Sequence, residues 1–399
     1  MNGSILTLNA GSSSLKFALF NTDTALSETI RGEIENFATA PHFIVRDPAG
    51  RVLTEKSWPA DAKDSFADAL ETLLVFADAH LDRGGLAAVG HRVVHGGAEH
   101  IAPARVTPAL LTALHALIAL DPLHMPHNLK PMQIIAARRP GLMQVACFDT
   151  AFHHTMPAVA SAFALPREIT AAGIRRYGFH GLSYEYVARR LRELVPDLAS
   201  GKVIVAHLGA GASMCAMQNG VSIATTMGFS ALEGLIMATR CGRLDPGVLL
   251  YLNAQGHSFA DLEELLYRRS GLLGVSGVSG DVRTLLASDN PHAFEAIELF
   301  TYQIAIEAGG LVSALGGLDG LIFTAGIGEN APAIRAAACE RLHWLGLRID
   351  ERANAANAGC ISAADSAVKV YVIATNEEAM IAEHTKTLGA AVSEKENGP

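Results

Sequence analysis

Short apolar runs alternate with amphipathic segments along this chain. Apolar residues recur every three or four positions between residues 64 and 81, which is the spacing of one helix face. The same pattern, or a proline at a helix start, predicts helices at residues 108–120, 184–195, 290–315, 332 onwards and 377–388. Apolar runs that end at polar or glycine-rich segments predict strands at residues 5–8, 15–20, 144–148, 203–207, 214–217, 321–325 and 368–374. This alternation predicts an α/β protein in which helices cover sheets.

Two of the predicted hairpins have the same design. In residues 5–19 and again in residues 203–217, an apolar strand leads through a polar residue, Asn9 or His207, into a turn of small residues and a second strand. The two copies are 203 − 5 = 198 positions apart, close to half of the 399-residue chain. The repeat predicts two related α/β domains that join near residue 150.

The second hairpin lies within a run that has no Asp, Glu, Lys or Arg, from Val203 to Leu232. A stretch of this length must be considered as a membrane span. However, its glycines, serines and threonines, together with His207, Gln218 and Asn219, are unfavourable in a lipid core. We therefore favour a buried sheet over a membrane span.

Composition narrows the function classes. The chain has 31 basic and 40 acidic residues, so its formal net charge is 31 − 40 = −9, which disfavours a nucleic-acid-binding surface. Five scattered cysteines without a CxxC pair indicate neither a disulfide framework nor a zinc knuckle. Residues 1–8 lack the basic and apolar regions of a secretory signal. We therefore expect a cytoplasmic protein with no nucleic-acid or membrane partner.

Three turns of small residues fit phosphate binding. They lie at Gly11, at Gly209–Gly211 and at Gly326–Gly328, where the lack of bulky side chains lets backbone N–H groups approach an anion. Lys16 follows the first turn and offers a point charge for a phosphate. The sequence GxxxxGK[ST] is absent, so the turns do not form a P-loop.

The third turn has a competing interpretation. Gly326-x-Gly328-x-x-Ala331 follows a predicted strand, and Asp350 lies about 20 residues further on, as in a dinucleotide-binding fingerprint. Such a fingerprint usually follows the first strand of a domain, whereas this one comes late in the chain. In addition, Glu329 stands beside the expected position of a pyrophosphate. An NAD-dependent dehydrogenase is therefore the remote alternative.

Charged residues in apolar surroundings are candidates for chemistry. Arg92 and Arg240 stand in segments with almost no other charge, and a guanidinium binds carboxylate or phosphate through paired N–H groups. Asp149 and Glu377 lie at the ends of predicted elements, where carboxylates suit Mg²⁺, which also takes waters and substrate phosphates. No HExxH spacing occurs among the 16 histidines, so a zinc hydrolase is disfavoured.

Together these segments resemble the signature sequences of the acetokinase family, the short-chain acyl kinases. The first is Asn9-Ala10-Gly11-Ser12-Ser13-Ser14-Leu15-Lys16. Segments similar to the family's other motifs follow in order at residues 90–97, 148–153, 176–181, 207–209, 227–228, 232–234, 239–240, 279–283, 323–330 and 375–378. Each motif alone is weak evidence for the family, but all of them occur in the expected order and together they span nearly the whole chain.

The resemblance implies a fold and a reaction. The fold is the actin-like ATPase superfold, in which two duplicated α/β domains surround a central cleft. Residues 1–150 would form an N-terminal domain on the acyl-substrate side, with a C-terminal helix of about residues 378–399 packing back on it, and residues 151–377 a nucleotide-binding and dimerisation domain. The reaction is ATP plus acetate giving ADP plus acetyl phosphate, a reversible, direct in-line transfer that requires Mg²⁺ or, as a substitute, Mn²⁺. A homodimer is also implied.

The family's catalytic residues carry over to matching positions. Arg92 and Arg240 are expected to hold the acyl carboxylate and the migrating phosphoryl group. His180 is expected to stabilise the transition state, Asp149 to be catalytic and His124 to assist. A non-catalytic ATP-binding member of the superfold would not need this set, so we disfavour that alternative. The residues expected to line the methyl pocket are Val94, Leu123 and Phe179.

Metal and nucleotide residues carry over as well. Asn9 and Glu377 are expected to hold Mg²⁺, and Ser12 and Lys16 to contact ATP phosphate. On this interpretation the uncharged run forms the floor of the nucleotide cleft, where a carboxylate would repel ATP. The residues expected to bind nucleotide are His207, Leu208, Gly209, Ala210, Gly211, Asp281, Val282, Arg283, Gly326, Ile327, Gly328, Glu329 and Asn330.

Five positions depart from the family's pattern. Ala210 stands for an Asn in the second turn, which puts one nucleotide contact in doubt. Ala231 stands for a Pro near the acyl pocket, and Met125, Cys241 and Arg243 also differ. Because the change at Ala231 enlarges the pocket, a propionate or other short-chain acyl kinase is the nearest alternative.

Overall fold

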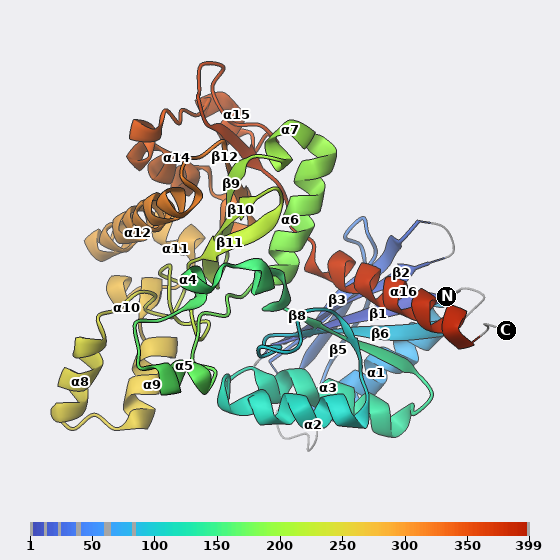
Figure 1. The fold of residues 1–399 in the computed structure, drawn as a ribbon. Coiled ribbons are helices and arrows are strands. Elements are labelled where there is room, and N and C mark those ends of the chain that lie inside the picture. Colours follow the sequence, from blue (N-terminus) through green and yellow to red (C-terminus); the bar gives the residue numbers. More distant parts are fainter. Residues whose placement is uncertain are drawn as a thin grey trace. The chain divides into compact units, whose positions relative to one another are not determined.

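The computed structural model describes residues 3–11, 14–22, 25–36, 41–59, 65–81 and 85–396. The chain forms two compact units (Figure 1). Unit 1 comprises Met1–Ala151 and Asn376–Pro399, and unit 2 comprises Phe152–Thr375. Each unit has a β-sheet with helices packed on it, so the predicted α/β class is confirmed.

In its described residues, the sheet of unit 1 has the strand order β5-β4-β3-β2-β1-β6-β8-β7. β1 is antiparallel to β2 and parallel to β6, and β6 is parallel to β8. The carboxyl ends of β1, β6 and β8 therefore lie at one edge of the sheet, where α/β proteins commonly bind ligands. The strands are β1 (Ser4–Ala10), β2 (Ser14–Asn21), β3 (Ser27–Glu35), β4 (His42–Arg46), β5 (Val52–Ser57), β6 (Leu86–Val93), β7 (Ala104–Arg105) and β8 (Met143–Phe148).

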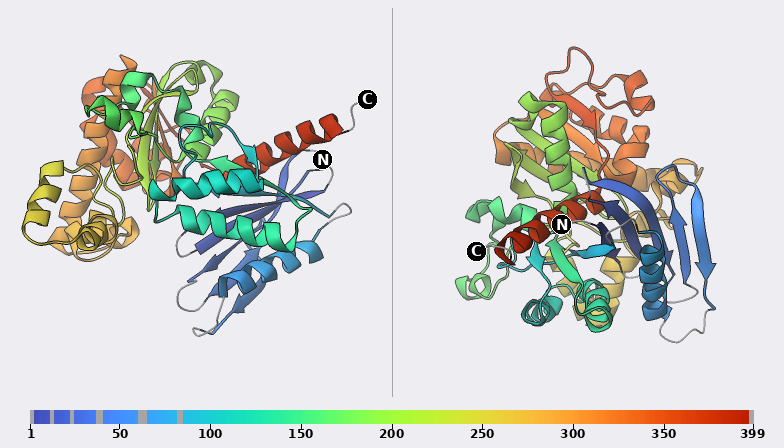
Figure 2. Two further views of the ribbon diagram at one scale, coloured as in Figure 1. Left: turned by 60° about the horizontal axis from the view of Figure 1, so that its bottom comes forward. Right: turned by 90° about the vertical axis from the view of Figure 1, so that its right-hand side faces the viewer.

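Helices pack on both faces of this sheet because its central strands are apolar on both sides. Leu6 on β1 belongs to a buried cluster with Leu70 of α1 (Ser65–Ala79). Ile5 points to the opposite face, since side chains alternate along a strand, and packs with Ala88 and Ala382 of α16 (Glu377–Glu396). Figures 1 and 2 show α16 on one side of the sheet and α1, α2 (Pro108–Ala116) and α3 (Met125–Arg138) on the other.

Gly90 on β6 allows α16 to lie directly on the sheet. A Cβ atom at this position would overlap the Thr385 Oγ1 and Ile381 Cγ2 atoms of α16. Thr385 is fully buried, and its hydroxyl donates to the carbonyl of Ile381 at 2.7 Å. This close packing fixes α16, whose first residue is Glu377, against the strands of unit 1.

The sheet of unit 2 repeats the central arrangement of unit 1. In the described residues its order is β11-β10-β9-β12-β13, with β10 antiparallel to both β9 and β11, and β12 parallel to both β9 and β13. β9 begins 202 − 4 = 198 positions after β1, so both hairpins of the predicted repeat are present. The strands are β9 (Lys202–Leu208), β10 (Ala212–Gln218), β11 (Val221–Thr225), β12 (Gly320–Thr324) and β13 (Lys369–Val372).

The uncharged run at residues 203–232 forms strands of this sheet and not a membrane helix. It contains β10, β11 and all of β9 except Lys202, and residues 203–208 are all buried. Within the part of the chain that the structure describes, no helix is long and apolar enough to cross a membrane. The buried strands explain the lack of charge, so the membrane-span alternative for this run is wrong.

The remaining helices belong to unit 2. Their arrangement is shown in Figure 1. They are α4 (Ala158–Ser161), α5 (Arg167–Ala171), α6 (Gly181–Leu194), α7 (Pro196–Ala199), α8 (Pro246–Ala254), α9 (Phe259–Arg268), α10 (Gly271–Ser276), α11 (Val282–Leu286), α12 (Pro291–Leu315), α13 (Ala325–Asn330), α14 (Pro332–Arg341) and α15 (Glu351–Ala355).

Some elements differ from the sequence pattern. The predicted helix at residues 108–120 is divided into α2 and the 3₁₀ turn Leu117–Ala119, and the last helix runs to Glu396 instead of ending near residue 388. The pattern does not predict β3, β4 and β5. In β5 every residue but one is exposed, so the segment lacks the alternation of apolar and polar residues that indicates a strand.

Candidate active site

Four side chains meet where β1, β6 and β8 end, and we call them the Arg92 cluster: Asn9, Arg92, Asp149 and Glu377. Arg92 donates from Nε to Asp149 Oδ2 at 2.9 Å, and its Nη2 donates to the same oxygen. Its Nη1 donates to Asn9 Oδ1 at 3.2 Å. The Asn9 Nδ2 donates to Glu377 Oε2 at 3.3 Å, and Arg92 Nε lies 3.8 Å from that oxygen. One guanidinium on β6 thus joins two carboxylates and an amide, which come from β1, the end of β8 and the start of α16.

Burial and charge act together in the Arg92 cluster. Asp149 is fully buried, and burial raises the pKa of the Glu377 carboxyl to about 7. The carboxylates of Asp149 and Glu378 also contribute to this rise, whereas Arg92 and Lys16 oppose it. Burial alone would lower the pKa of Arg92, but Asp149 and Glu377 outweigh it, so that pKa is raised and Arg92 stays charged.

The cluster has the donors that a hard divalent cation takes. Among the described residues, the buried Asp149 Oδ1 has no hydrogen-bond partner, and the carboxylate of Glu377 and the amide oxygen of Asn9 lie beside the same guanidinium. Within the described residues, no three His, Cys, Asp or Glu side chains gather as a closed metal cage. Mg²⁺ is commonly bound by one or two carboxylates with waters and substrate phosphates, whereas Zn²⁺ sites usually contain His or Cys ligands. The donor set of the Arg92 cluster therefore fits Mg²⁺ better than Zn²⁺.

Unit 1 carries three further predicted residues. Val94 follows β6, and Leu123 and His124 come just before α3. His124 is held by Asp121, whose Oδ1 lies 2.8 Å from His124 Nδ1. Asn128 on α3, which sequence reasoning missed, accepts from Val94 N at 2.8 Å and donates to the carbonyl of Ala10 at 2.6 Å. The fully enclosed Asn128 amide therefore ties the segment after β6 to the end of β1. Phe179, predicted for the same methyl pocket, belongs to unit 2.

Lys16 lies close to the Arg92 cluster. It is the cross-strand partner of Asn9 in the β1–β2 ladder, so the two side chains are on the same face of the sheet. It also lines a cavity of about 290 Å³ with Glu378, Arg31 and Arg46, among other residues. Ser12, the other residue predicted to contact ATP phosphate in unit 1, lies outside the described residues.

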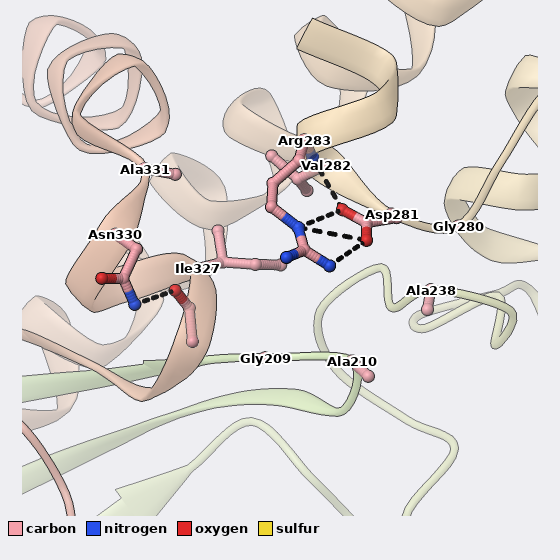
Figure 3. Close-up of a pocket in the computed structure, with 11 residues that line it drawn as sticks. Gly209, Ala210, Ala238, Gly280, Asp281, Val282, Arg283, Ile327, Asn330 and Ala331 are labelled. Carbon is pink, nitrogen blue, oxygen red and sulfur yellow. Dashed lines mark hydrogen bonds and ion pairs between the residues drawn. The ribbon is translucent and has the colours of Figure 1, made fainter. Parts of the chain in front are cut away.

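Unit 2 contains a larger cavity of about 550 Å³ (Figure 3). Three segments form it: the turn after β9, the start of α11, and α13 with the residue that follows it. It includes eight of the residues predicted to bind nucleotide, and Ala238, Gly280 and Ala331 complete the lining. The eight residues are Gly209, Ala210, Asp281, Val282, Arg283, Gly326, Ile327 and Asn330.

Five residues predicted to bind nucleotide do not line this cavity. They are His207, Leu208, Gly211, Gly328 and Glu329. Leu208 is fully buried in β9, because the last residue of the strand packs into the sheet. The Glu329 carboxylate accepts from the backbone N–H of Thr375 at 3.1 Å. This hydrogen bond holds the segment that follows β13, so the Glu329 side chain has a structural role.

The short helix α13 is held by a buried arginine. Arg335 on α14 is fully buried, and its Nη1 donates to the carbonyls of Gly328 and Glu329 in α13, each at 2.9 Å. Ala325, the first residue of α13, has φ = +64°, a left-handed conformation that strains a residue other than glycine. Sequence reasoning missed Arg335, because nothing in the motif indicates that this side chain points back to it.

His180, His207 and Arg240 also belong to unit 2. The rings of His180 and His207 stack with their centroids 4.2 Å apart. His180 has φ = +59°, which is uncommon for a non-glycine residue, and it precedes the first turn of α6. Arg240 donates from Nη1 to the carbonyl of Ala231 at 2.9 Å. Ala231 is one of the positions at which the sequence differs from the pattern of the acyl kinases that it resembles.

Comparison with known proteins identifies the family of the chain. Residues 4–383 match the Acetokinase family. The acetate kinase of Rhodopseudomonas palustris strain TIE-1 is 54% identical over 391 residues, which are 96% of this chain and 98% of that protein. The acetate kinase of Methylocella silvestris is 48% identical over 97% of this chain and 98% of that protein. The chain belongs to the acetokinase family.

Solved structures of the acetokinase family share the fold. A propionate kinase from Francisella tularensis matches with a TM-score of 0.89 at 37% identity, over 97% of this chain and 100% of that one. Acetate kinase from Porphyromonas gingivalis matches with a TM-score of 0.86 at 35% identity, over the same shares. The resemblance seen in the sequence and the duplicated actin-like fold that it implies are therefore confirmed.

Membership of the acetokinase family removes the dehydrogenase alternative. The structure gives a physical reason as well. Asp350, the presumed ribose ligand of the fingerprint, caps α15 instead, because its Oδ1 accepts from the backbone N–H groups of Arg352 and Ala353 at 2.9 and 3.0 Å. The helix after Gly326 and Gly328 is α13, of only six residues, which differs from the long helix of a dinucleotide-binding unit.

Proposed function

We propose that this chain is an acetate kinase, an enzyme that transfers the γ-phosphoryl group of ATP to acetate in a reversible reaction. The Arg92 cluster carries the proposal, because it combines a charged guanidinium with a buried carboxylate oxygen that no described residue of the chain hydrogen-bonds. Acid groups in this arrangement are suited to a divalent cation, and the guanidinium to a carboxylate substrate. Relatives named acetate kinase at up to 54% identity support the same substrate pair.

Phosphoryl transfer to acetate requires that the reactants are positioned and that the charge on the transferring oxygens is neutralised. It does not require a strong base. The acetate carboxylate is ionised at neutral pH and has no proton to lose. We assign Arg92 to the acyl carboxylate and Arg240 to the migrating phosphoryl group, since guanidinium groups neutralise charge on transferring oxygens. His180 stabilises the transition state, and His124, held by Asp121, assists. Attack by acetate on the γ-phosphorus is direct and in line.

Asn9, Asp149 and Glu377 are the residues that would hold Mg²⁺ or Mn²⁺. The oxygen donors of this set and the orphaned Asp149 Oδ1 support that assignment. When bound, the cation would neutralise charge on the phosphates of ATP. The raised pKa of Glu377 favours its protonated form in the absence of a cation, which relieves repulsion between the buried carboxylates.

The cavity of about 550 Å³ in unit 2 supports nucleotide binding there. Its lining is mostly backbone and apolar side chains, which suits a base and ribose, and small residues at the turn after β9 leave N–H groups open to phosphate. In unit 1, Lys16 and Ser12 are assigned to ATP phosphate. Val94, Leu123 and Phe179 are assigned to the methyl group of acetate.

A homodimer is proposed from an apolar surface of unit 2. α8 has no buried residue, although its sequence is mostly apolar. Leu250 and Tyr251 on α8 are 74% and 64% exposed, and Phe259 at the start of α9 is 80% exposed. Apolar surface of this kind commonly marks a protein interface. We propose that a second copy of the chain covers it, and that the protein works in the cytoplasm, where its five cysteines, none of which forms a disulfide, stay reduced.

Acetyl phosphate formation is measured by trapping with hydroxylamine. With ATP, Mg²⁺ and acetate the wild-type protein is expected to give acyl hydroxamate, and removal of Mg²⁺ by a chelator to stop it. Arg240→Ala should lower kcat by about 10³-fold or more, as loss of a charge-neutralising arginine does in other phosphoryl transferases. Arg243→Ala is the matched control, since Arg243 is exposed and pairs with Glu307.

The two variants make this assay decisive. Equal activity of Arg240→Ala and Arg243→Ala would contradict the assignment of Arg240. Folded wild-type protein that binds ATP but yields no hydroxamate would contradict the kinase itself.

Acyl-chain selectivity is the second prediction. Ala231 is nearly buried and its carbonyl accepts from Arg240, so this position adjoins the proposed phosphoryl site. We expect kcat/KM for propionate to lie within about tenfold of that for acetate, because the enlarged pocket admits the extra methylene, whereas a pocket that excludes one methylene discriminates by about 10- to 200-fold. Ala231→Pro should increase the preference for acetate. A strict acetate preference in the wild type would refute the enlarged pocket.

Oligomeric state is the third prediction. Light scattering should give twice the mass of the chain for the wild type and a smaller mass for Leu250→Asp, because a buried unpaired carboxylate weakens an apolar interface by several kcal/mol, or roughly a hundredfold or more in affinity. Val75→Asp on α1 is the control, since Val75 is also exposed, at 56%, but lies in unit 1. A wild-type monomer, or a Leu250→Asp variant that remains dimeric, would refute the proposed surface.

A further inference from the structure

His180 lies at the end of a chain of buried hydroxyl groups in unit 2. The Tyr184 hydroxyl lies 2.5 Å from Ser213 Oγ, and Ser213 Oγ lies 2.8 Å from His180 Nδ1. Tyr184 and Ser213 are both fully buried. Tyr184 comes from the first turns of α6, and Ser213 from β10, the second strand of the hairpin whose turn contains Gly211.

Counting hydrogens fixes the direction of the two hydrogen bonds. The Tyr184 hydroxyl has one hydrogen, and among the described residues its hydrogen-bond partner is Ser213 Oγ. Leaving a buried donor unmade is costly, so Tyr184 donates to Ser213. Ser213 also has one hydroxyl hydrogen, which is then directed to His180 Nδ1. Nδ1 accepts this bond and carries no proton, so the ring proton is on Nε2.

The other nitrogen of the ring faces the turn after β9. A Cβ atom built at Gly211 would lie 3.3 Å from His180 Nε2. The ring is held in this direction by the stacked ring of His207, tilted by only 16°, which is itself bonded through Nδ1 to Ser183 Oγ at 2.8 Å. The Nε2–H group therefore points toward the turn of small residues that contributes Gly209 and Ala210 to the nucleotide cavity.

We propose that Tyr184 and Ser213 are positioning residues that hold His180 as the neutral Nε2–H tautomer, which donates a hydrogen bond to an oxygen of the transferring phosphoryl group. The role of His180 in this inference rests on the proposed kinase function. The imidazole keeps its proton throughout, so no proton needs to be supplied or removed. The opposite tautomer would present a lone pair to the anion and repel it.

The same unit offers a matched control. Ser222 is also fully buried, and its Oγ lies 2.9 Å from the Nδ1 of His153. There Nε2 donates to the carbonyl of Phe179 at 2.9 Å, so the ring is occupied by protein on both sides. Ser222→Ala thus removes an equivalent buried hydroxyl–histidine contact from a histidine that has no assigned part in the reaction.

The test combines nitrogen NMR with steady-state kinetics on the full-length protein. In ¹⁵N-histidine-labelled wild type, the signal that disappears in His180→Gln should show an unprotonated Nδ1 and a protonated Nε2. Tyr184→Phe and Ser213→Ala should shift that signal toward a protonated Nδ1. They should also lower kcat by about 10- to 100-fold, as loss of one donor to a developing charge does, with KM for ATP and acetate nearly unchanged. Ser213→Thr, which keeps the hydroxyl, should retain the wild-type tautomer.

Each outcome bears on the proposal. A wild-type His180 protonated on Nδ1, or a Tyr184→Phe variant with unchanged tautomer and kcat, overturns it. Equal losses of kcat in Ser222→Ala and Ser213→Ala also overturn it, because general destabilisation would then explain the effect. Tyr184→Phe removes a single oxygen, so it keeps the test valid if Ser213→Ala fails to fold. The NMR result is read without turnover, so an inactive wild type with the expected tautomer refutes the kinase function and supports the relay.

Discussion

The buried ion pair between Arg92 and Asp149 is the interaction on which unit 1 depends. It joins the ends of β6 and β8, and through Asn9 and Glu377 it extends to β1 and α16. A buried charge without a partner is strongly destabilising, so each group holds the other in place. Because one oxygen of Asp149 has no hydrogen-bond partner in the described part of the chain, the same pair that organises the strand ends also offers an acceptor to a ligand. Structure and proposed chemistry thus share the same atoms.

The two units share one strand arrangement but differ in where their charged residues lie. In both, a hairpin has an antiparallel strand on one side and two parallel strands on the other, and the sequence of the hairpin turn consists of small residues. Unit 1 gathers charge at its strand ends, in the Arg92 cluster and Lys16. The central strands of unit 2 are almost free of charged residues, and its cavity is lined mostly by backbone and apolar groups, which suits a polyanionic nucleotide. A duplicated fold therefore provides the turns proposed to bind anions, and different side chains divide the proposed work between acyl group and nucleotide.

Residues next to a turn or a strand end were accessible to sequence reasoning, and residues that act from a distance were not. Arg92 and Asp149 stand out because charge is rare around them, and the strand before Asp149 is evident from its apolar run. Asn128 bonds to Ala10, 118 positions away, and no local pattern reports such a contact. Arg335 is similar, since a fully buried arginine that binds carbonyl oxygens has the same sequence signature as an exposed one.

The stereochemical course at phosphorus tests the central claim most directly, namely that acetate attacks the γ-phosphorus of ATP without an intermediate on the protein. The protein would be given ATP made chiral at the γ-phosphorus with oxygen isotopes, together with acetate and Mg²⁺, and the configuration of the acetyl phosphate would be determined. A single in-line displacement inverts the configuration. Inversion is the result that the account predicts. Retention would require two displacements through a phosphorylated side chain and would contradict it.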